Sequence, residues 1–300
     1  MKKILFFTQN RWAFGSIHHG LCKELYKHGI FANLLDYCIQ YTFEEFELLN
    51  QTYDYFVTQP DSIPILIDYR VPLNKIVAVA HGEWDVNLSQ SNNVHERTNN
   101  YDIHSYGVIS KKLFNIVDSM NYKIKPKLVT NGIIFDAFYE KPSDKLNVVG
   151  YGGSFSSPNF AGQEIKRGSL VQLATESAGL KFLLNGLYNH LAMAGYYKNV
   201  DSVIMSSIEE ACGLPMLEAA AAGRLCIGTP VGYFTENSAK GGGIQVSLEE
   251  NLFVNEVTAI LNYYKNNPEE YRKKCLDIQE YARYNYDWKY VIDGWIELFN

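Results

Sequence analysis

Long hydrophobic runs are absent from this 300-residue sequence. No stretch approaches the roughly 18 consecutive apolar residues that a membrane-spanning helix needs. The apolar run Ile4–Phe7 follows two lysines, but it is much shorter than the hydrophobic region of a secretory signal peptide, and the polar Gln9 and Asn10 come soon after it. We therefore expect a buried strand at the N-terminus and a cytoplasmic protein with at most peripheral membrane contact.

Cysteine is scarce, and its pattern excludes two classes of structure. The number is odd, the spacing is wide and no CxxC pair occurs, which argues against a disulfide framework and against a zinc site. Reduced thiols in a cytoplasmic protein fit this pattern better. The five cysteines are Cys22, Cys38, Cys212, Cys226 and Cys275.

An excess of positive charge is also lacking, since 27 Lys and Arg face 33 Asp and Glu, for a formal net charge of −6. This balance excludes a nucleic-acid-binding footprint at the level of the whole chain. Metal patterns are missing too: no DxD-like acidic pair follows a predicted strand, and the adjacent His18 and His19 point in different directions on a helix. We expect no nucleic-acid partner, no metal and no other cofactor.

Short apolar strands alternate with amphipathic helical stretches, and this alternation is typical of an α/β protein with parallel sheets covered by helices. In the first half we expect strands near 3–9, 31–37, 53–59, 75–82, 106–109 and 127–133, with helices at 17–29 and from 110 onward. In the second half we expect strands near 148–155, 181–186, 201–207 and 224–232, with helices at 168–179, 248–267 and from 268 onward.

The polar segment 139–147, "YEKPSDKLN", interrupts the alternation and is the best candidate for a linker. It separates two α/β halves, which predicts domains over about 1–140 and 141–283. Ligands usually bind in the cleft between two such halves and at the carboxyl ends of their strands.

The segment 209–230, "EEACGLPMLEAAAAGRLCIGTP", has Glu210 and Glu218 on either side of a Gly-Leu-Pro break and few other polar side chains. Pro215 suits a helix start and Gly223 a helix end, so we expect a helix over 215–222. One interpretation is a buried alanine-rich helix. The other is a ligand site, because helix N-termini attract phosphate and carboxylates accept paired hydrogen bonds from vicinal hydroxyls. Glu210 and Glu218 would then hold opposite ends of one ligand, in which a diphosphate joins a sugar to a ribose.

This segment resembles the signature of the retaining glycosyltransferases of family 4, which have the GT-B fold. Ala211 and Cys212 replace the usual Gly-Phe pair. The residues that match the signature are Ser207, Glu210, Gly213, Leu214, Pro215, Glu218, Ala219, Gly223, Gly232 and Glu236.

The resemblance extends to other parts of the chain. "VTNGIIFDAFYE" (129–140) looks like the segment that closes the N-terminal domain of the family, with Thr130 in place of its proline. "YDWKYVIDGWIELF" (286–299) looks like the closing helix that crosses back to the first domain, so the resemblance implies that 284–300 pack on 1–140. It further implies two Rossmann-like domains that face each other across a cleft.

The family resemblance also implies roles for particular residues. Glu218 would hold the ribose of a nucleotide-sugar and Glu210 its sugar, while His81 would lie beside the transferred sugar. Gly15 and Ser16 would belong to the first loop near the acceptor and the diphosphate. The further donor-binding residues implied are Lys166, Gly153, Ser154, Gly213, Leu214, Pro215 and Ser207, with Arg167 among the catalytic residues.

One departure concerns the diphosphate. The family usually places Arg in the glycine-rich loop that opens the second domain and Lys in a Lys-Gly pair soon after. Here Ser154 stands in the loop, and Arg167 precedes Gly168 with Lys166 beside it. A dinucleotide fingerprint GxGxxG fails as well, because Phe155 occupies its third glycine position.

The resemblance therefore predicts a retaining glycosyltransferase that needs no metal. It would move a sugar from a nucleotide-sugar donor to a carbohydrate, lipid-linked or other acceptor. Two alternatives stay open: a catalytically degenerate GT-B protein that binds nucleotide-sugar without turnover, and a nucleotide-sugar epimerase of the same fold. Ser154 and the short connection between the strands at 181–186 and 201–207 favour the first of these alternatives.

Overall fold

A computed structural model describes residues 1–10, 12–86, 101–157, 162–186 and 192–300. The chain divides into two compact units: unit 1 comprises Met1–Gly132 and Trp288–Asn300, and unit 2 comprises Ile133–Asp287. The boundaries differ from the predicted 140/141 and 283/284. The backbone N–H of Ile133 donates to the Tyr286 carbonyl at 2.8 Å, and Ile133 also forms a β-bridge with Asp287. These contacts join the beginning and the end of unit 2.

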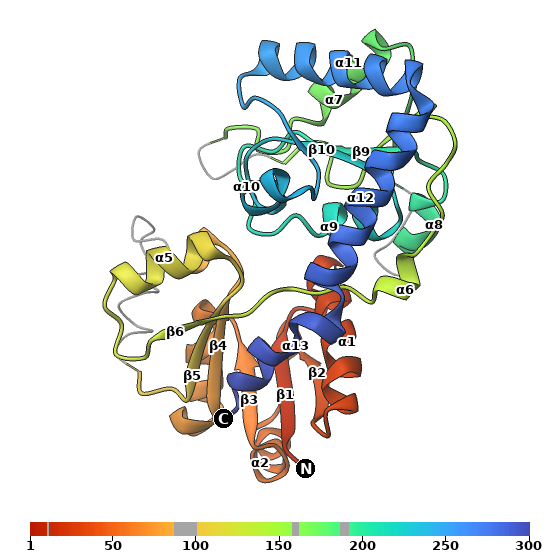
Figure 1. Cartoon of the computed structure of the whole chain (residues 1–300). Coiled ribbons are helices and arrows are strands. Elements are labelled where there is room, and N and C mark those ends of the chain that lie inside the picture. The colour runs from red at the N-terminus through yellow and green to blue at the C-terminus, as the bar shows by residue number, and fades with distance from the viewer. Residues whose placement is uncertain (11, 87–100, 158–161, 187–191) are drawn as a thin grey trace. The chain divides into compact units, whose positions relative to one another are not determined.

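Unit 1 contains a six-stranded parallel sheet in the order β2-β1-β3-β4-β5-β6 (Figure 1). Strand β4 is wholly buried and β1 nearly so, as expected for central strands covered by helices on both faces. The strands are β1 (Lys3–Thr8), β2 (Phe31–Asp36), β3 (Tyr55–Thr58), β4 (Ile76–Ala80), β5 (Ser105–Val108) and β6 (Pro126–Leu128).

The helices of unit 1 begin where the sequence supplies caps. Thr42 and Glu45 form a reciprocal capping box at the start of α2, and the Ser110 hydroxyl accepts the Leu113 N–H at the start of α5. The helices are α1 (Trp12–Lys27), α2 (Phe43–Thr52), α3 (Ile63–Asp68), α5 (Lys111–Ser119) and α13 (Trp288–Glu297), with 3₁₀ turns at Pro60–Ser62, Leu73–Lys75 and Glu83–Asp85.

The closing helix α13 packs into unit 1, in agreement with the expectation that the C-terminus returns to the first domain. Trp288 and Trp295 are 2% and 0% exposed, and Trp295 donates its indole N–H to the Thr130 carbonyl at 2.9 Å. The Ser105 hydroxyl on β5 donates to the Leu298 carbonyl at 2.6 Å. The C-terminal segment is therefore part of the unit 1 core.

Unit 2 contains a five-stranded sheet, also parallel, in the order β11-β10-β9-β7-β8. Its strands are β7 (Val148–Tyr151), β8 (Lys181–Leu184), β9 (Ser202–Met205), β10 (Leu225–Gly228) and β11 (Ile244–Gln245). Its helices are α6 (Phe135–Phe138), α7 (Gly168–Ser177), α8 (Met193–Tyr197), α9 (Leu214–Ala221), α10 (Tyr233–Asn237), α11 (Glu250–Asn266) and α12 (Pro268–Tyr286), with a 3₁₀ turn at Ser238–Lys240.

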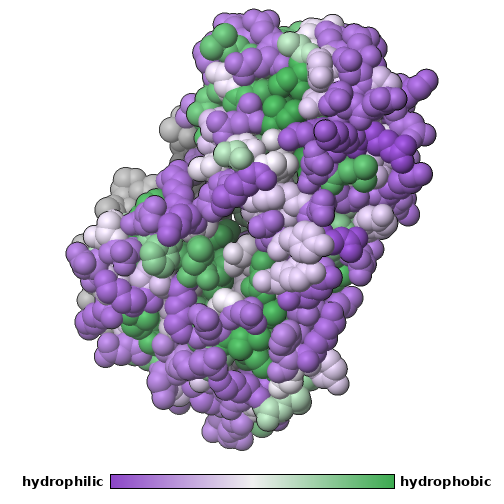
Figure 2. Space-filling model, in the orientation of Figure 1, coloured by the Kyte–Doolittle hydropathy of each residue, from purple (hydrophilic) through white to green (hydrophobic). Residues whose placement is uncertain are grey.

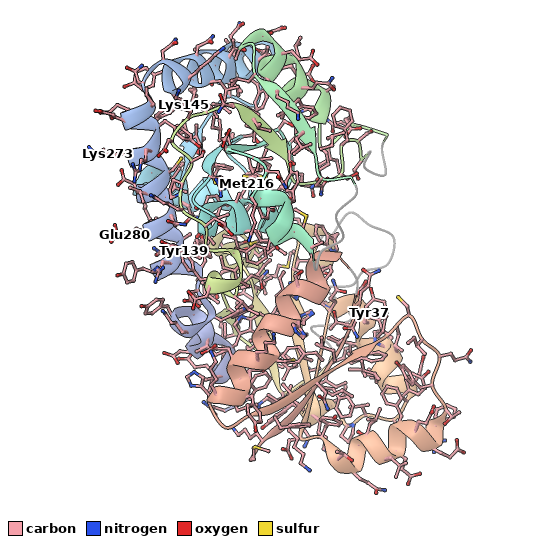
Figure 3. All side chains as sticks on the ribbon, turned by 90° about the vertical axis from the view of Figure 1, so that its right-hand side faces the viewer. Tyr37, Tyr139, Lys145, Met216, Lys273 and Glu280 are labelled. Atoms are coloured by element: carbon pink, nitrogen blue, oxygen red, sulfur yellow. The ribbon has the colours of Figure 1, made fainter. Side chains whose placement is uncertain are left out.

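Long helices of unit 2 show the separation of faces that the sequence pattern indicates. On α12, Tyr271, Cys275 and Ile278 are buried, whereas Lys273 and Glu280 are exposed and point outward (Figure 3). The same helix is largely hydrophilic on the face shown in Figure 2. Among the described residues, no helix is both long enough and apolar enough to span a membrane.

In each sheet the order of the strands reverses next to the first strand. In unit 1, β1 lies between β2 and β3, and in unit 2, β7 lies between β8 and β9. In open parallel sheets, ligands bind outside the carboxyl ends of the strands at such a switch point. The segments that follow β7 and β9 in unit 2, and β1, β3 and β4 in unit 1, are therefore the places to examine.

Candidate functional site

Helix α9 starts at Leu214, one residue before the predicted start, and nearly all of it is buried. Gly213 caps it in a left-handed conformation, with φ of +74°, which a residue with a side chain rarely adopts. The alanines lie against α12, where the Gln279 amide donates to the Ala221 carbonyl at 2.8 Å. Small side chains are needed because two helices approach closely here. The buried interpretation of this segment is therefore correct for its alanines.

Glu218 lies inside unit 2 and is only 3% exposed. Its Oε2 accepts a hydrogen bond from the Tyr197 hydroxyl at 2.9 Å. Burial raises the pKa of the Glu218 carboxyl to about 8, because the charged form loses its hydration. Ionisation of this buried carboxyl becomes favourable near neutral pH only when further hydrogen-bond donors approach it.

Glu210 occupies a different environment in the segment between β9 and α9. Lys166 forms an ion pair with its Oε1, and the Ser207 hydroxyl donates to the same oxygen at 3.0 Å. The side chains of Lys166 and Glu210 are 24% and 18% exposed, so the pair is accessible at its edge. Three residues predicted from the sequence, Ser207, Glu210 and Lys166, thus come together here.

Arg167 does not lie beside this pair. Its guanidinium Nε donates to the Ser206 carbonyl and its Nη1 to the Leu248 carbonyl, both at 2.8 Å. The side chain is buried, and desolvation lowers the pKa of Arg167. The structure therefore places the Arg167 guanidinium on backbone carbonyls, and Lys166 is the cation that reaches Glu210.

The glycine-rich segment after β7 approaches the start of α9. A Cβ built on Gly152 would lie 2.8 Å from the Cβ of Pro215, so no larger residue fits there without movement. Gly153 is half-buried, and Ser154 is exposed with its hydroxyl donating to the Ser156 carbonyl at 2.8 Å. Gly153 and Ser154 thus follow β7, next to the segment that carries Glu210 and Gly213.

Sequence reasoning did not identify Glu164, whose carboxylate joins Ser156 and Ser157 to the backbone just before α7. Its Oε1 accepts the backbone N–H groups of Ser157 at 2.8 Å and of Lys166 at 2.9 Å. The Ser156 hydroxyl also donates to this carboxylate, and these bonds lower the pKa of Glu164 to about 2. The only sequence signal was an acidic residue between two serines and the helix start.

In unit 1, Gly15 and Ser16 lie within helix α1 rather than in a loop. The prediction of a first loop at this position is wrong, because the helix already begins at Trp12. Gly15 is buried and Ser16 is half-buried. The next turn of the helix carries His18, whose Nδ1 is 3.5 Å from the Thr8 hydroxyl at the end of β1.

His81 follows β4 and is 5% exposed, and its ring lies 5.0 Å from that of Phe14 and 5.7 Å from that of His18. Burial lowers the pKa of His18 to about 4 and that of His81 well below its usual range. Both imidazoles are therefore neutral near pH 7, and each can offer one donor and one acceptor.

Asp85 holds the turn that carries His81, a role that sequence reasoning missed. Its Oδ2 accepts the backbone N–H groups of His81 at 2.6 Å and Gly82 at 3.1 Å, and burial raises the pKa of this carboxyl to about 7. Among the described residues, the atoms Asp85 Oδ1, His81 Nδ1 and Thr58 Oγ1 are buried without a hydrogen-bond partner. Buried polar atoms of this kind are uncommon and often mark functional sites.

Several exposed lysines follow β5, and three of them form salt bridges. Salt bridges join Lys112 to Glu83, Lys123 to Asp102 and Lys125 to Asp118. Exposed pairs of this kind fit a solvated face. Across the described residues, no group of three or more His, Cys, Asp or Glu side chains is placed to hold a metal ion.

Comparison with known proteins places this geometry in context. Residues 140–263, which lie within unit 2, match the family described as "Glycosyl transferases group 1". No curated protein sequence matches significantly.

Solved structures match over nearly the whole chain. Sucrose-phosphate synthase from Thermosynechococcus elongatus has a TM-score of 0.70 at 15% identity, with 100% of this chain and 98% of that chain covered. The HepE protein of Anabaena in complex with UDP and glucose has a TM-score of 0.71 at 15% identity and 99% coverage of both chains.

The catalytic domain of starch synthase IV from Arabidopsis thaliana, bound to ADP and acarbose, has a TM-score of 0.72 at 13% identity and covers 99% of this chain and 98% of that one. These structural similarities, together with two parallel sheets that follow one another along the chain, show that the chain has the GT-B fold.

Proposed function

We propose that this protein is a retaining glycosyltransferase that moves a sugar from a nucleotide-sugar to an acceptor. The observation that carries the proposal is the convergence of Lys166, Glu210 and Ser207 beside the segment that leads into α9. This group lies at the switch point of the unit 2 sheet and within the stretch that matches glycosyl transferases group 1. The chemistry of the group, one cation and one carboxylate near a helix start, suits a diphosphate-linked sugar.

The donor would bind along unit 2. The start of α9 at Leu214 and Pro215 would face the diphosphate, with Lys166 supplying the positive charge. Glu218 would accept hydrogen bonds from the ribose hydroxyls and Glu210 from those of the sugar. We assign the diphosphate to Lys166 rather than Arg167, since the Arg167 guanidinium is engaged by the carbonyls of Ser206 and Leu248.

The reaction would proceed by attack on the same face from which the diphosphate departs. The bond from the anomeric carbon to the phosphate oxygen breaks, and the bond to the acceptor oxygen forms. The departing diphosphate takes the acceptor proton, and Lys166 stabilises the charge that develops on it. In unit 1, the neutral His81 would bind a hydroxyl beside the transferred sugar. The acceptor would be a carbohydrate, a lipid-linked sugar or another hydroxyl compound.

We further propose that the protein acts in the cytoplasm without a metal or other cofactor and without a nucleic-acid partner. The test incubates the full chain with UDP-glucose, ADP-glucose and GDP-mannose and a panel of saccharide acceptors, with product anomers assigned by NMR. We expect transfer with retained configuration that EDTA leaves unchanged. Transfer that EDTA abolishes and magnesium or manganese restores would contradict metal independence.

A binder without turnover is the second candidate, and the Lys166–Glu210 ion pair is the observation that favours it. In the ligand-free chain the cation is already paired, and Ser154 stands exposed where the family places an arginine. Binding of a nucleotide-sugar with neither transfer nor slow hydrolysis would identify such a binder. Conversion of the donor sugar to its epimer would instead identify the epimerase alternative.

A further inference from the structure

The hydroxyl of Tyr197 lies between two oxygens of the α9 segment. It is 2.9 Å from Glu218 Oε2 and 3.2 Å from the carbonyl oxygen of Pro215. Tyr197 itself is 0% exposed and comes from α8, the short helix before β9. One buried phenol therefore contacts both the carboxyl proposed to hold ribose and the first turn of the helix proposed to face the diphosphate.

The surroundings hold this hydroxyl in place. The Tyr197 ring lies 6.0 Å from that of Phe138 and 5.3 Å from that of Tyr196. A Cβ built on Gly152, after β7, would lie 3.4 Å from the hydroxyl oxygen. The phenol thus closes the space between the glycine-rich segment and α9, with little freedom to move elsewhere.

Other titratable groups on the elements that pack against α9 do not replace Tyr197. They include Asp136 on α6, Tyr196 on α8, Cys226 on β10, Tyr233 and Glu236 on α10, and Tyr271, Lys274, Cys275, Tyr281, Arg283 and Tyr286 on α12. Among the described residues, burial and the Tyr197 bond are the influences that shift the pKa of Glu218. Within the part of the chain that the structure describes, Tyr197 is thus the polar neighbour that shifts the pKa of Glu218.

A phenol carries one hydrogen, so the two contacts depend on the state of Glu218. When Glu218 is ionised, Tyr197 donates its hydrogen to Oε2. When Glu218 is protonated, the carboxyl can donate to the phenol oxygen, and the phenol hydrogen turns to the Pro215 carbonyl. The hydroxyl changes its acceptor whenever Glu218 gains or loses a proton.

We propose that Tyr197 is the positioning residue of the nucleotide site, holding Glu218 turned so that its remaining oxygen, Oε1, accepts the ribose hydroxyls once the carboxyl loses its proton on binding. This proposal rests on the proposed function of Glu218 and adds a residue outside the signature segment. It assigns Tyr197 no contact with the ligand. Its effect passes through the carboxyl that it bonds.

A pH dependence follows from this arrangement. Ribose hydroxyls donate to the ionised carboxyl, so nucleotide binding favours loss of the Glu218 proton. With a pKa of about 8 for Glu218 in the ligand-free protein, binding at pH 7 releases a proton and strengthens as the pH rises toward 8. The Tyr197 bond lowers this pKa, so its removal moves the dependence to higher pH.

The test is calorimetry of the full chain with UDP, ADP and GDP from pH 6 to 9.5, in buffers of different ionisation enthalpy. Tyr197→Phe keeps the ring and removes the hydroxyl. We expect it to weaken binding of the preferred nucleotide by about 10-fold at pH 7, as loss of a hydrogen bond to a charged group implies. The difference in affinity between Tyr197→Phe and the wild type should become smaller toward pH 9.5. The number of protons released on binding at pH 7 should be larger in the variant.

Tyr196→Phe is the matched control. Tyr196 is equally buried on the same helix, but its hydroxyl donates to the Leu183 carbonyl at 3.0 Å. It should lower stability to a similar degree and leave the pH profile of binding unchanged. In a Glu218→Gln background, Tyr197→Phe should have little further effect on affinity, because no ionisation remains to be controlled. Thermal unfolding establishes that each variant is folded, and Tyr197→Met takes the place of Tyr197→Phe if it is not.

The outcomes separate the two levels of inference. If the wild type binds none of the three nucleotides, the proposed function and this proposal both fail. If it binds one of them, and Tyr197→Phe shifts neither the pH profile nor the proton release, the role of Tyr197 alone is overturned. An equal loss of affinity in the wild-type and Glu218→Gln backgrounds would also overturn it, since that result describes a purely structural tyrosine.

Discussion

At the scale of single residues, Glu210 and Glu218 have opposite electrostatic environments. Glu210 is half-buried and has a lysine and a serine hydroxyl as donors, so its charge is compensated before any ligand arrives. Glu218 is fully buried and has one phenol beside it. The same residue type is therefore prepared for two different tasks, and mutation of each should have a different consequence.

We predict that the two glutamates affect nucleotide binding differently. Glu218→Gln should weaken binding of the free nucleoside diphosphate and of the nucleotide-sugar alike. The expected loss of affinity is about 10- to 150-fold, the range for a lost charge-assisted hydrogen bond. Glu210→Gln releases Lys166 from its ion pair, so the free diphosphate should bind as well as before or slightly more tightly, while turnover of the sugar donor falls. Calorimetry with both ligands tests this, and equal losses of diphosphate affinity in the two variants would contradict it.

Glu218 should also make stability depend on pH. The pKa of Glu218 is about 8 in the fold against 4.5 for a solvated glutamate, so folding favours the protonated form. This contribution to stability is complete below about pH 4.5 and is lost as the pH rises through about 8, a change of about 5 kcal/mol. Urea unfolding at pH 5 and pH 8.5 measures the free energy of unfolding. Relative to the wild type, Glu218→Gln should be more stable at pH 8.5 than it is at pH 5.

The exposed Glu209 provides the control for this measurement. Glu209→Gln stands close to Glu218 in sequence but changes a solvated side chain, so its difference from the wild type should be the same at both pH values. A constant difference for Glu218→Gln as well would mean that the buried carboxyl does not titrate in this range.

At the scale of elements, the start of α9 depends on one backbone conformation. Gly213 has φ of +74°, and a Cβ there would also lie 3.2 Å from the Met205 sulfur. We predict that Gly213→Ala lowers the free energy of unfolding by about 1–2 kcal/mol, because the left-handed conformation is strained for alanine. Chemical denaturation measures this loss.

Gly186 is the matched control for Gly213, since a Cβ there would meet no atom of the described residues within 4 Å and its φ lies outside the left-handed region. Gly186→Ala should be neutral or slightly stabilising. Nucleotide affinity should fall in Gly213→Ala beyond the effect on stability if the start of α9 faces the diphosphate. Unchanged affinity in a destabilised variant would remove the start of α9 from the donor site.

At the scale of the whole molecule, the chain leaves unit 1 after Gly132, forms unit 2 and returns to unit 1 at Trp288. We predict that Trp295→Ala destabilises unit 1 by about 3–5 kcal/mol, as expected for deleting a buried aromatic side chain. It also leaves the Thr130 carbonyl without its indole donor. Urea denaturation monitored by circular dichroism gives the loss.

Tyr290 on the same helix is 48% exposed and serves as the control for Trp295. Tyr290→Ala should change the free energy of unfolding by well under 1 kcal/mol. Comparable losses in the two variants would show that α13 is held by its surface and not by its buried tryptophans. Removal of residues 287–300 should accordingly destabilise unit 1 severely.

Local sequence determined the elements and their order. Alternating apolar strands and amphipathic helices predict two parallel α/β units, and Pro215 predicts the start of α9 to within one residue. The signature around Glu210 and Glu218 also places the candidate site in the second unit. These features follow from residue types at fixed spacing, which act through the backbone over one or two turns.

Tertiary structure alone decided which atoms meet. The strand expected over 127–133 ends at Leu128, since the carbonyl of Thr130 accepts a hydrogen bond from Trp295, far away in sequence. Lys166 rather than Arg167 reaches Glu210, because the left-handed backbone at Arg167 turns its guanidinium toward the carbonyls of Ser206 and Leu248.

The state of Glu218 was likewise invisible in the sequence. Its pKa depends on burial by helices from distant parts of the chain and on a phenol from α8. Residue spacing carries no information on these contacts, because desolvation and hydrogen bonding depend on distances in space. The sequence by itself thus determined that an acid stands at this position, and the packing of unit 2 decided that it is buried and bonded to Tyr197, with its pKa raised to about 8.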